Sequence, residues 1–180
     1  MKFITLLSLF FVTLFLANTP SLYAQGSTES ASPKVDYTLP YPGILPDHPL
    51  YKLKVLRDKL IPLFISAPQK KVEFYLLQTD KGIEATRVLV KKGDIELAKE
   101  TGLKAENNYT ILSYIVKANK LDISDKEYAK LYLAAEKHQD VLRTIISSVP
   151  KKDQKIFQTI LYFSEKNEKE IKNTQNSLIK

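Results

Sequence analysis

The stretch "KKGDIELA", residues 91–98, contains the end of one helix and the start of the next. Lysines followed by glycine are typical of a helix C-terminus, because the cations oppose the negative end of the dipole and glycine tolerates the left-handed cap. Asp94 is placed to cap the helix that follows. A connection this short favours antiparallel neighbours. The stretch therefore predicts a helical hairpin, and with it an all-α fold.

Helical periodicity continues on both sides of this hairpin, and the sequence shows no strand-like alternation. The helices after the first are of similar length and their connections are short. We therefore expect an up-and-down antiparallel bundle of about five helices. The expected ranges are 50–64, 67–92, 95–119, 125–148, and 150 to a C-terminal end that frays beyond Glu165.

Two sequence signals mark the starts of helices within the bundle. Ser124-Asp-Lys-Glu127 matches a capping box, in which the serine and glutamate side chains bond to each other's backbone N–H groups. Ile123 and Tyr128 flank it as a hydrophobic staple. Ser66-Ala-Pro-Gln69 has the same pattern with glutamine in the last position, so we expect a second capping box there.

The first helix follows a proline-rich approach that stiffens the chain. Asp47 or His48 is expected to cap this helix, with Pro49 in its first turn. Pro62 lies inside the helical pattern, which predicts a kink or a break near Leu60. The apolar stripe of the helix comprises Leu50, Leu53, Leu56 or Arg57, Leu60 and Phe64.

The apolar positions of the other helices predict which side chains face the core. They recur at intervals of three and four residues, which places them on one face of each helix. The expected inner faces are Val72, Leu76, Thr79, Ile83, Thr86 and Val90; Ala98, Thr101, Ala105, Asn108, Leu112 and Ile115; Leu131, Ala135, Leu142, Ile145 and Val149; and Ile156, Ile160 and Phe163.

The N-terminal segment predicts a secretory signal peptide. Lys2 precedes a nearly continuous apolar run, and Ala24 offers a cleavage site before Gln25. The run is about 15 residues, short of the roughly 20 that span a bilayer, and an uncleaved membrane anchor is the alternative. The expected division is a signal peptide over 1–24, a flexible and then proline-rich linker over 25–48, and a helical domain over 49–180.

The chain contains no cysteine. This excludes a lipobox, and with it a lipoprotein anchor, and it excludes disulfides and thiolate metal ligands. The domain must therefore be stabilised by burial and helix packing. Its length is sufficient, since a domain of about 150 residues buries some two thirds of the surface of its unfolded chain.

The helical domain is basic. The chain has 27 cations and 20 carboxylates; two of the cations and three of the carboxylates precede residue 49, so residues 49–180 carry a net charge of +8. Lys91, Lys92, Lys151 and Lys152 fall near helix ends that an alternating bundle places at one pole. We call these four the cationic rim and consider contact with an anionic envelope polymer. The alternative is that they are solvated lysines that compensate helix dipoles.

Enzymatic motifs are not found. No nucleophile elbow, phosphate-binding loop or glycine-rich dinucleotide turn appears, and the five glycines are scattered. His48 and His138 are interpreted as surface or capping residues, since neither lies in a metal-ligand pattern. The predominance of lysine over arginine does not favour specific nucleic-acid recognition. A metal-binding, stress-sensing or hydrolytic protein is the alternative, using scattered carboxylates such as Glu73, Glu96, Glu100 and Glu136.

Several motifs resemble a bacterial family called domain of unknown function 5667. They are Leu45-Pro-Asp-His-Pro-Leu-Tyr-Lys-Leu-Lys54, Leu63-Phe64 with Pro68, and Lys92-Gly93-Asp-Ile-Glu-Leu-Ala98. The resemblance covers about residues 44–118, and residues 120–180 have no match in it. It implies an exported helical protein, and it brings no catalytic residue to carry over.

Together these features predict an exported, non-enzymatic helical module of the bacterial cell envelope. Its expected partner is a protein or an anionic envelope polymer, and no cofactor is expected. After cleavage of the signal peptide we expect no transmembrane segment.

Overall fold

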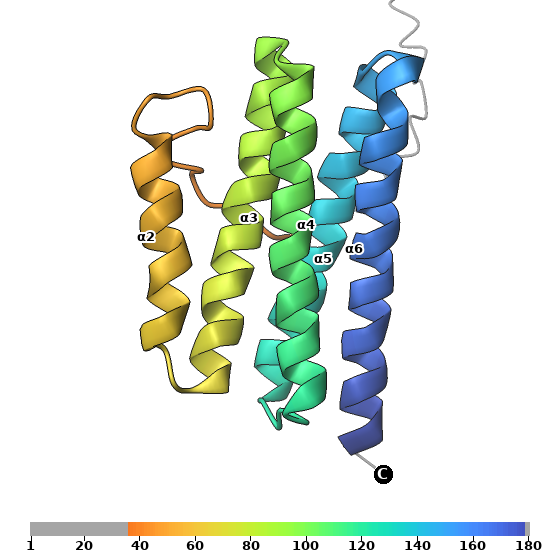
Figure 1. Cartoon of the computed structure of the whole chain (residues 1–180). Helices are drawn as coiled ribbons and strands as arrows, with labels where there is room; N and C mark the ends of the chain where they lie inside the picture. Colours follow the sequence, from red (N-terminus) through yellow and green to blue (C-terminus); the bar gives the residue numbers. More distant parts are fainter. Residues whose placement is uncertain (1–35, 179–180) are drawn as a thin grey trace, which may run out of the picture. The chain divides into compact units, whose positions relative to one another are not determined.

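The computed structural model describes residues 36–178, in which the chain forms five α-helices and no strand. The predicted signal peptide, its cleavage site and the first part of the linker lie outside the described residues. Residues Val35–Lys180 form one compact unit. The helices are α2 Tyr51–Phe64, α3 Pro68–Lys92, α4 Ile95–Ala118, α5 Asp125–Ser148 and α6 Lys151–Leu178 (Figure 1).

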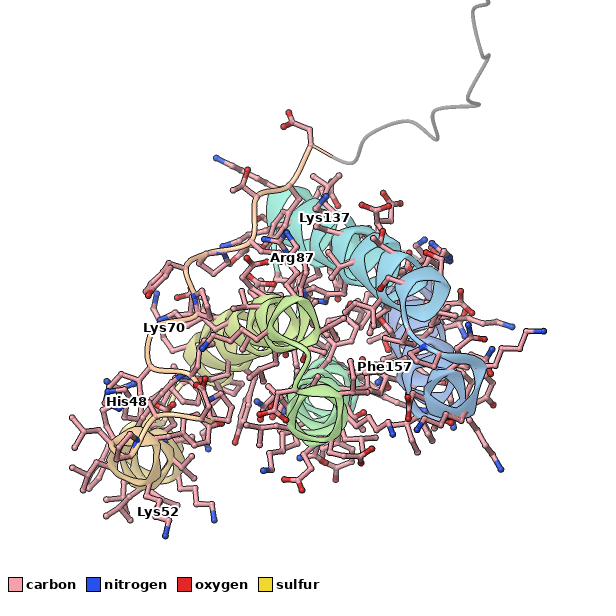
Figure 2. All side chains as sticks on the ribbon, turned by 90° about the horizontal axis from the view of Figure 1, so that it is seen from above. His48, Lys52, Lys70, Arg87, Lys137 and Phe157 are labelled. Carbon is pink, nitrogen blue, oxygen red and sulfur yellow. The ribbon has the colours of Figure 1, made fainter. Side chains whose placement is uncertain are left out.

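Helices α3 to α6 form an antiparallel four-helix bundle, as the short connections predict. Helix α3 packs on α4, α4 on α6, α6 on α5, and α5 on α3, which closes the ring. Seen along the helix axes, α2 stands beside this ring and not within it (Figure 2). Two clusters of buried apolar side chains fill the bundle; one surrounds Tyr109 and Leu131, the other Leu142 and Phe157.

The α3–α4 hairpin forms as the opening stretch predicts. Gly93 ends α3 in the left-handed conformation, with φ of 83°, and its N–H donates to the carbonyl of Val90. The Asp94 side chain accepts a hydrogen bond from the N–H of Leu97 at 3.4 Å. Farther along the hairpin, a Cβ on Gly82 would lie 2.6 Å from the Cβ of Ala105, so glycine is what lets α3 and α4 approach closely there.

One predicted capping box is confirmed and the other is wrong. Ser124 Oγ accepts from the N–H of Glu127 at 3.3 Å, and Glu127 Oε2 accepts from the N–H of Ser124 at 2.9 Å. At the start of α3 the N-cap is Ala67, and no side chain caps the helix. Pro68 occupies the first turn instead, where its lack of an N–H costs nothing.

The first helix ends at Phe64 as predicted, but its N-cap and its course through Pro62 differ from the prediction. Its N-cap is Leu50, so neither Asp47 nor His48 is the N-cap residue, although His48 Nδ1 accepts from the N–H of Leu50 at 3.1 Å. The helix continues through Pro62 to Phe64, so the break near Leu60 does not occur. Pro62 lies in the last turn, where only one backbone hydrogen bond is lost.

The predicted inner faces are largely correct, with errors of one position. Asn108 and Ile115 are only half-buried, whereas their neighbours Tyr109 and Val116 are fully buried. In the same way Leu89 is buried in α3 where Val90 was expected. Such shifts arise because a straight helix turns 100° per residue, so a face drifts across adjacent positions.

The C-terminal helix shows a larger departure. Phe163, expected inside, is 41% exposed, and Ile156, also expected inside, is only half-buried, whereas its neighbour Phe157 is fully buried. The helix continues to Leu178, well beyond the predicted fraying at Glu165. Its inner face there carries polar side chains, which an apolar pattern does not detect; they include Ser164, Asn167, Glu168 and Thr174.

Candidate binding surface

The segment before α2 is fixed to the bundle by hydrogen bonds. Tyr37 Oη donates to Asp80 Oδ2 of α3 at 2.7 Å. Lys54 Nζ of α2 donates to the carbonyls of Pro42 and Ile44 at 3.1 and 3.3 Å. We call the proline-rich segment before α2, residues 36–50, the strap. It runs over the bundle and sets the position of α2.

Asp80 also connects the strap to the interior of the bundle. Its Oδ1 lies 2.7 Å from Nε2 of His138, and both side chains are buried. The prediction of a surface or capping role for His138 is therefore wrong. The histidine ring also packs edge-on against Tyr109 of α4. Burial, together with the negative charge of Asp80 and the hydrogen bond to its carboxylate, raises the pKa of the Tyr37 hydroxyl well above its usual range.

A layer of polar side chains crosses the middle of the bundle. Glu106 of α4 accepts a 2.7 Å hydrogen bond from Asn167 of α6, and its second oxygen has no hydrogen-bond partner in the described chain. Gln139 of α5 donates to Glu168 of α6 at 2.7 Å. Burial raises the pKa of Glu106 to about 8, and the hydrogen bond from Asn167 acts in the opposite direction. This layer joins helices across the core and opens onto no described cavity.

A groove of about 780 Å³ separates α2 from α3 and α4. Its α2 wall includes Val55 and Pro62, and its opposite wall includes Phe74 and Leu103. Amides and charges close its edges; they are Asp58, Lys59, Gln78, Glu100, Lys104, Asn107 and Asn108. The groove reflects the sparse contact of α2 with the other helices. None of the α2 side chains is buried.

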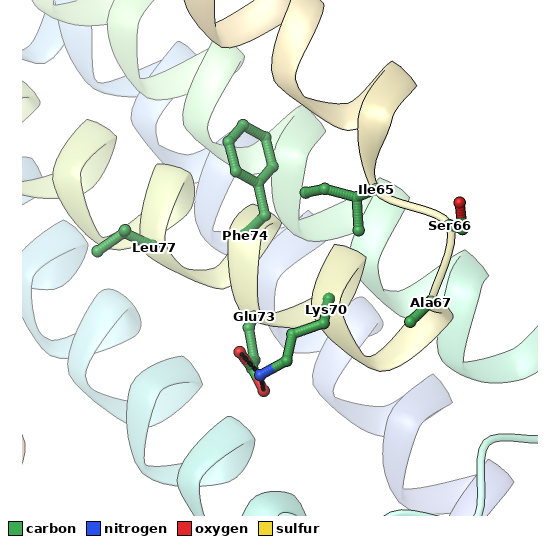
Figure 3. Close-up of a pocket in the computed structure, with 7 residues that line it drawn as sticks. All are labelled: Ile65, Ser66, Ala67, Lys70, Glu73, Phe74 and Leu77. Carbon is green, nitrogen blue, oxygen red and sulfur yellow. Dashed lines mark hydrogen bonds and ion pairs between the residues drawn. The ribbon is translucent and has the colours of Figure 1, made fainter.

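A second, shallower hollow of about 520 Å³ lies at the turn from α2 to α3. Figure 3 shows Ile65 and Phe74 next to each other on one side of it and the Lys70–Glu73 ion pair on the other. Phe74 also lines the larger groove. Apolar surface therefore continues from the α2–α3 turn into the groove.

The cationic rim takes the expected place in the fold. Lys91 and Lys92 end α3, Lys151 and Lys152 begin α6, and these ends share one pole of the bundle (Figure 1). All four side chains are exposed. Lys92 is held by Asp47 of the strap at 2.5 Å, so it is partly neutralised.

The carboxylates considered for metal or hydrolytic chemistry do not gather. Glu73 pairs with Lys70, Glu96 with Lys99, and Glu100 with Lys104, each within its own helix. Over residues 36–178, no group of three or more histidine, aspartate and glutamate side chains is arranged to hold a metal ion. Within that same range, none of the helices has the length and apolar content to cross a membrane.

The chain belongs to the DUF5667 family, whose domain of unknown function matches residues 43–178. The match confirms the resemblance seen in the motifs near α2 and the α3–α4 hairpin, and it extends that resemblance through α5 and α6. No curated protein and no solved structure shows significant similarity to the chain.

The groove and the exposure of α2 are the features of this surface that the sequence pattern does not predict. The stripe of leucines in α2 is visible in the sequence, but its direction depends on the strap. Pro49 and Pro62 indicate only where this helix can begin and where it is prone to break, and they give no signal of its exposure.

Proposed function

We propose that this protein is an exported, non-enzymatic binding module whose partner is an anionic component of the cell envelope. The observation that carries the proposal is the unbalanced positive charge of the helical domain, +8 over residues 49–180. Exposed cations unopposed by carboxylates attract anionic partners over several ångströms. In the described chain, Lys52, Lys59, Lys91, Lys151 and Lys152 are exposed and form no ion pair.

Export is part of this proposal and depends on the N-terminal segment. If residues 1–24 are a signal peptide, the protein recovered outside the cytoplasm begins at Gln25. N-terminal sequencing of the exported protein checks this. Recovery of the intact chain in the membrane fraction would support the uncleaved anchor, and recovery in the cytosol would reject export.

Binding to a soluble anionic polymer tests the choice of partner. We expect the chain from Gln25 to bind polyphosphate weakly, and to release it as salt rises, because exposed charges are screened within about 8 Å at physiological ionic strength. The chain from Gln25 contains the whole compact unit Val35–Lys180 and both apolar clusters. No binding at low salt would reject an anionic polymer as the partner.

A pair of matched variants asks whether the cationic rim is the contact. We expect K91Q/K92Q/K151Q/K152Q to lose more polyphosphate binding than K104Q/K126Q/K130Q/K169Q, which removes the same charge from exposed positions elsewhere. Both variants should remain folded, since surface substitutions usually change stability by about 0.5 kcal/mol or less. Equal losses would show that net charge alone matters and that the rim is not a site.

A further inference from the structure

The outer face of α2 is apolar and uncovered. Leu53, Leu56 and Leu60 recur at helical spacing on one side of the helix, and Phe64 extends this face at its end. Their exposed fractions run from 46% for Leu60 to 83% for Phe64. An amphipathic helix of a globular domain ordinarily turns such a stripe toward the core. Here the stripe points away from the bundle.

The inner face of α2 explains this orientation. Tyr51, Val55 and Pro62 line the groove toward α3 and α4, together with the carboxylate of Asp58. Lys54 is engaged by the strap carbonyls, and its partial burial lowers its pKa. Because the strap fixes the start of α2, the helix cannot rotate its leucines inward without breaking these contacts.

Cations border the apolar stripe on both sides. Lys52 and Lys59 lie along one edge, both exposed and without an ion pair in the described chain. Arg57 lies along the other edge, 62% exposed, and its guanidinium bonds to the neighbouring Asp58. Leucine and phenylalanine bordered by lysine and arginine form the pattern of a helix that lies in the interface of an anionic bilayer.

A second copy of the chain fits this face poorly. Two antiparallel α2 helices related by a two-fold axis would bring the edge with Lys52 and Lys59 of one copy against the same edge of the other. In a parallel pair that edge would meet Arg57, whose charge Asp58 already offsets, so the second copy would supply no anionic group to either lysine. Like charges placed opposite each other oppose association. An anionic lipid surface meets both features at once, since its acyl chains accept the leucines and its headgroups accept the cations.

We propose that α2 is a membrane-surface helix, which embeds Leu53, Leu56, Leu60 and Phe64 at the headgroup boundary of an anionic bilayer while Lys52 and Lys59 contact the headgroups. This rests on the proposed function, because it specifies a lipid surface as the anionic partner. The bundle then stands above the membrane, held by the strap and α2.

Vesicle binding by the chain from Gln25 tests the proposal. The wild type binds vesicles that contain phosphatidylglycerol and does not bind phosphatidylcholine vesicles measurably. L53Q/L56Q/L60Q lowers the affinity for anionic vesicles by at least about a hundredfold, since each leucine loses its apolar burial. The control L133Q/Y162Q/F163Q removes exposed apolar side chains from α5 and α6 and leaves the affinity unchanged. Circular dichroism verifies that both variants are folded.

The contribution of the two lysines to vesicle binding and the depth to which α2 inserts are measured in separate experiments. K52Q/K59Q weakens binding to anionic vesicles by roughly fivefold for each lysine removed. The chain contains no tryptophan, so F64W introduces a single reporter. Its emission shifts to shorter wavelength on anionic vesicles and is quenched by brominated acyl chains. Y162W, at an exposed position of α6, shows neither effect.

The outcomes separate this inference from the proposed function. If the wild type binds polyphosphate but no vesicle, the inference is overturned and an anionic partner stands. Binding to neither overturns both. Vesicle binding that is unchanged in L53Q/L56Q/L60Q also overturns the inference. The inference is also overturned if sedimentation shows that the wild type is a dimer and that L53Q/L56Q/L60Q is a monomer, since α2 would then be an interface between copies.

Discussion

Tyr37 and Asp80 are 43 residues apart in the sequence and are joined by a 2.7 Å hydrogen bond from the tyrosine hydroxyl to the carboxylate. Asp80 uses its other oxygen for His138, so one carboxylate holds both the strap and α5 on α3. The bond matters for function because the strap sets the position of α2. It is also an interaction that a single substitution removes without changing the shape of the side chain.

Replacing Tyr37 by phenylalanine should lower the free energy of unfolding by about 1–2 kcal/mol, because a hydrogen bond to a charged group is lost at a partly buried site. Urea denaturation measures this. The strap should also become more accessible to limited proteolysis. Tyr41→Phe is the matched control, since Tyr41 is 82% exposed, and it should change neither quantity. Unchanged stability and proteolysis in Tyr37→Phe would show that the strap is held by other contacts.

Glu106 should make stability depend on pH. Burial raises its pKa from 4.5 to about 8, so in this window the folded state holds a proton that the unfolded state has lost. The contribution of Glu106 to the free energy of unfolding is therefore fully present below about pH 4.5. It falls as pH rises toward 8, by on the order of 1 kcal/mol per pH unit. Glu106→Gln should remove this slope.

The free energy of unfolding is measured by urea denaturation at several pH values between 5 and 8. The value for the variant is subtracted from that for the wild type at each pH. Glu100→Gln serves as the control, because Glu100 is exposed and pairs only with Lys104 on the same helix. A difference between wild type and Glu106→Gln that stays constant across this range would mean that Glu106 is ionised in the folded protein throughout.

Gly82→Ala should destabilise the bundle by about 1–3 kcal/mol, because its Cβ would lie 2.6 Å from that of Ala105 and would force α3 and α4 apart. The helix propensity of alanine would offset this by up to about 1 kcal/mol. The double variant Gly82→Ala/Ala105→Gly removes the 2.6 Å contact, leaves the new Cβ 3.2 Å from the Cα of residue 105, and should recover most of the lost stability. Thermal or urea unfolding of the three proteins tests this, and failure of the double variant to recover would contradict a steric cause.

Ser124→Ala should cost about 1 kcal/mol, the usual effect of removing an N-cap side chain. Ser66→Ala should be nearly neutral, because the N-cap of α3 is Ala67 and no side chain caps that helix. The two variants make the same chemical change in sequences that match the same pattern. Similar losses of urea stability for both would contradict the difference between the two helix starts.

The sequence by itself determined the helices, most of their ends and the family. Capping at Ser124, the glycine stop at Gly93 and the cap at Asp94 are interactions within about one turn, so their partners are close in the chain. The antiparallel order followed from short connections. The rim lysines reached one pole for the same reason.

Only the tertiary structure decided which polar groups are buried and where α2 points. Asp80 meets His138, and Glu106 meets Asn167, across separations of 58 and 61 residues. Such pairs leave no periodic signal, because the sequence does not distinguish a polar residue that is buried with a hydrogen-bond partner from one that is exposed to solvent. The direction of the α2 stripe depends likewise on the strap, whose anchors are Tyr37 and Lys54. A helix's periodicity defines its apolar face, and only the contacts of its neighbours decide what that face meets.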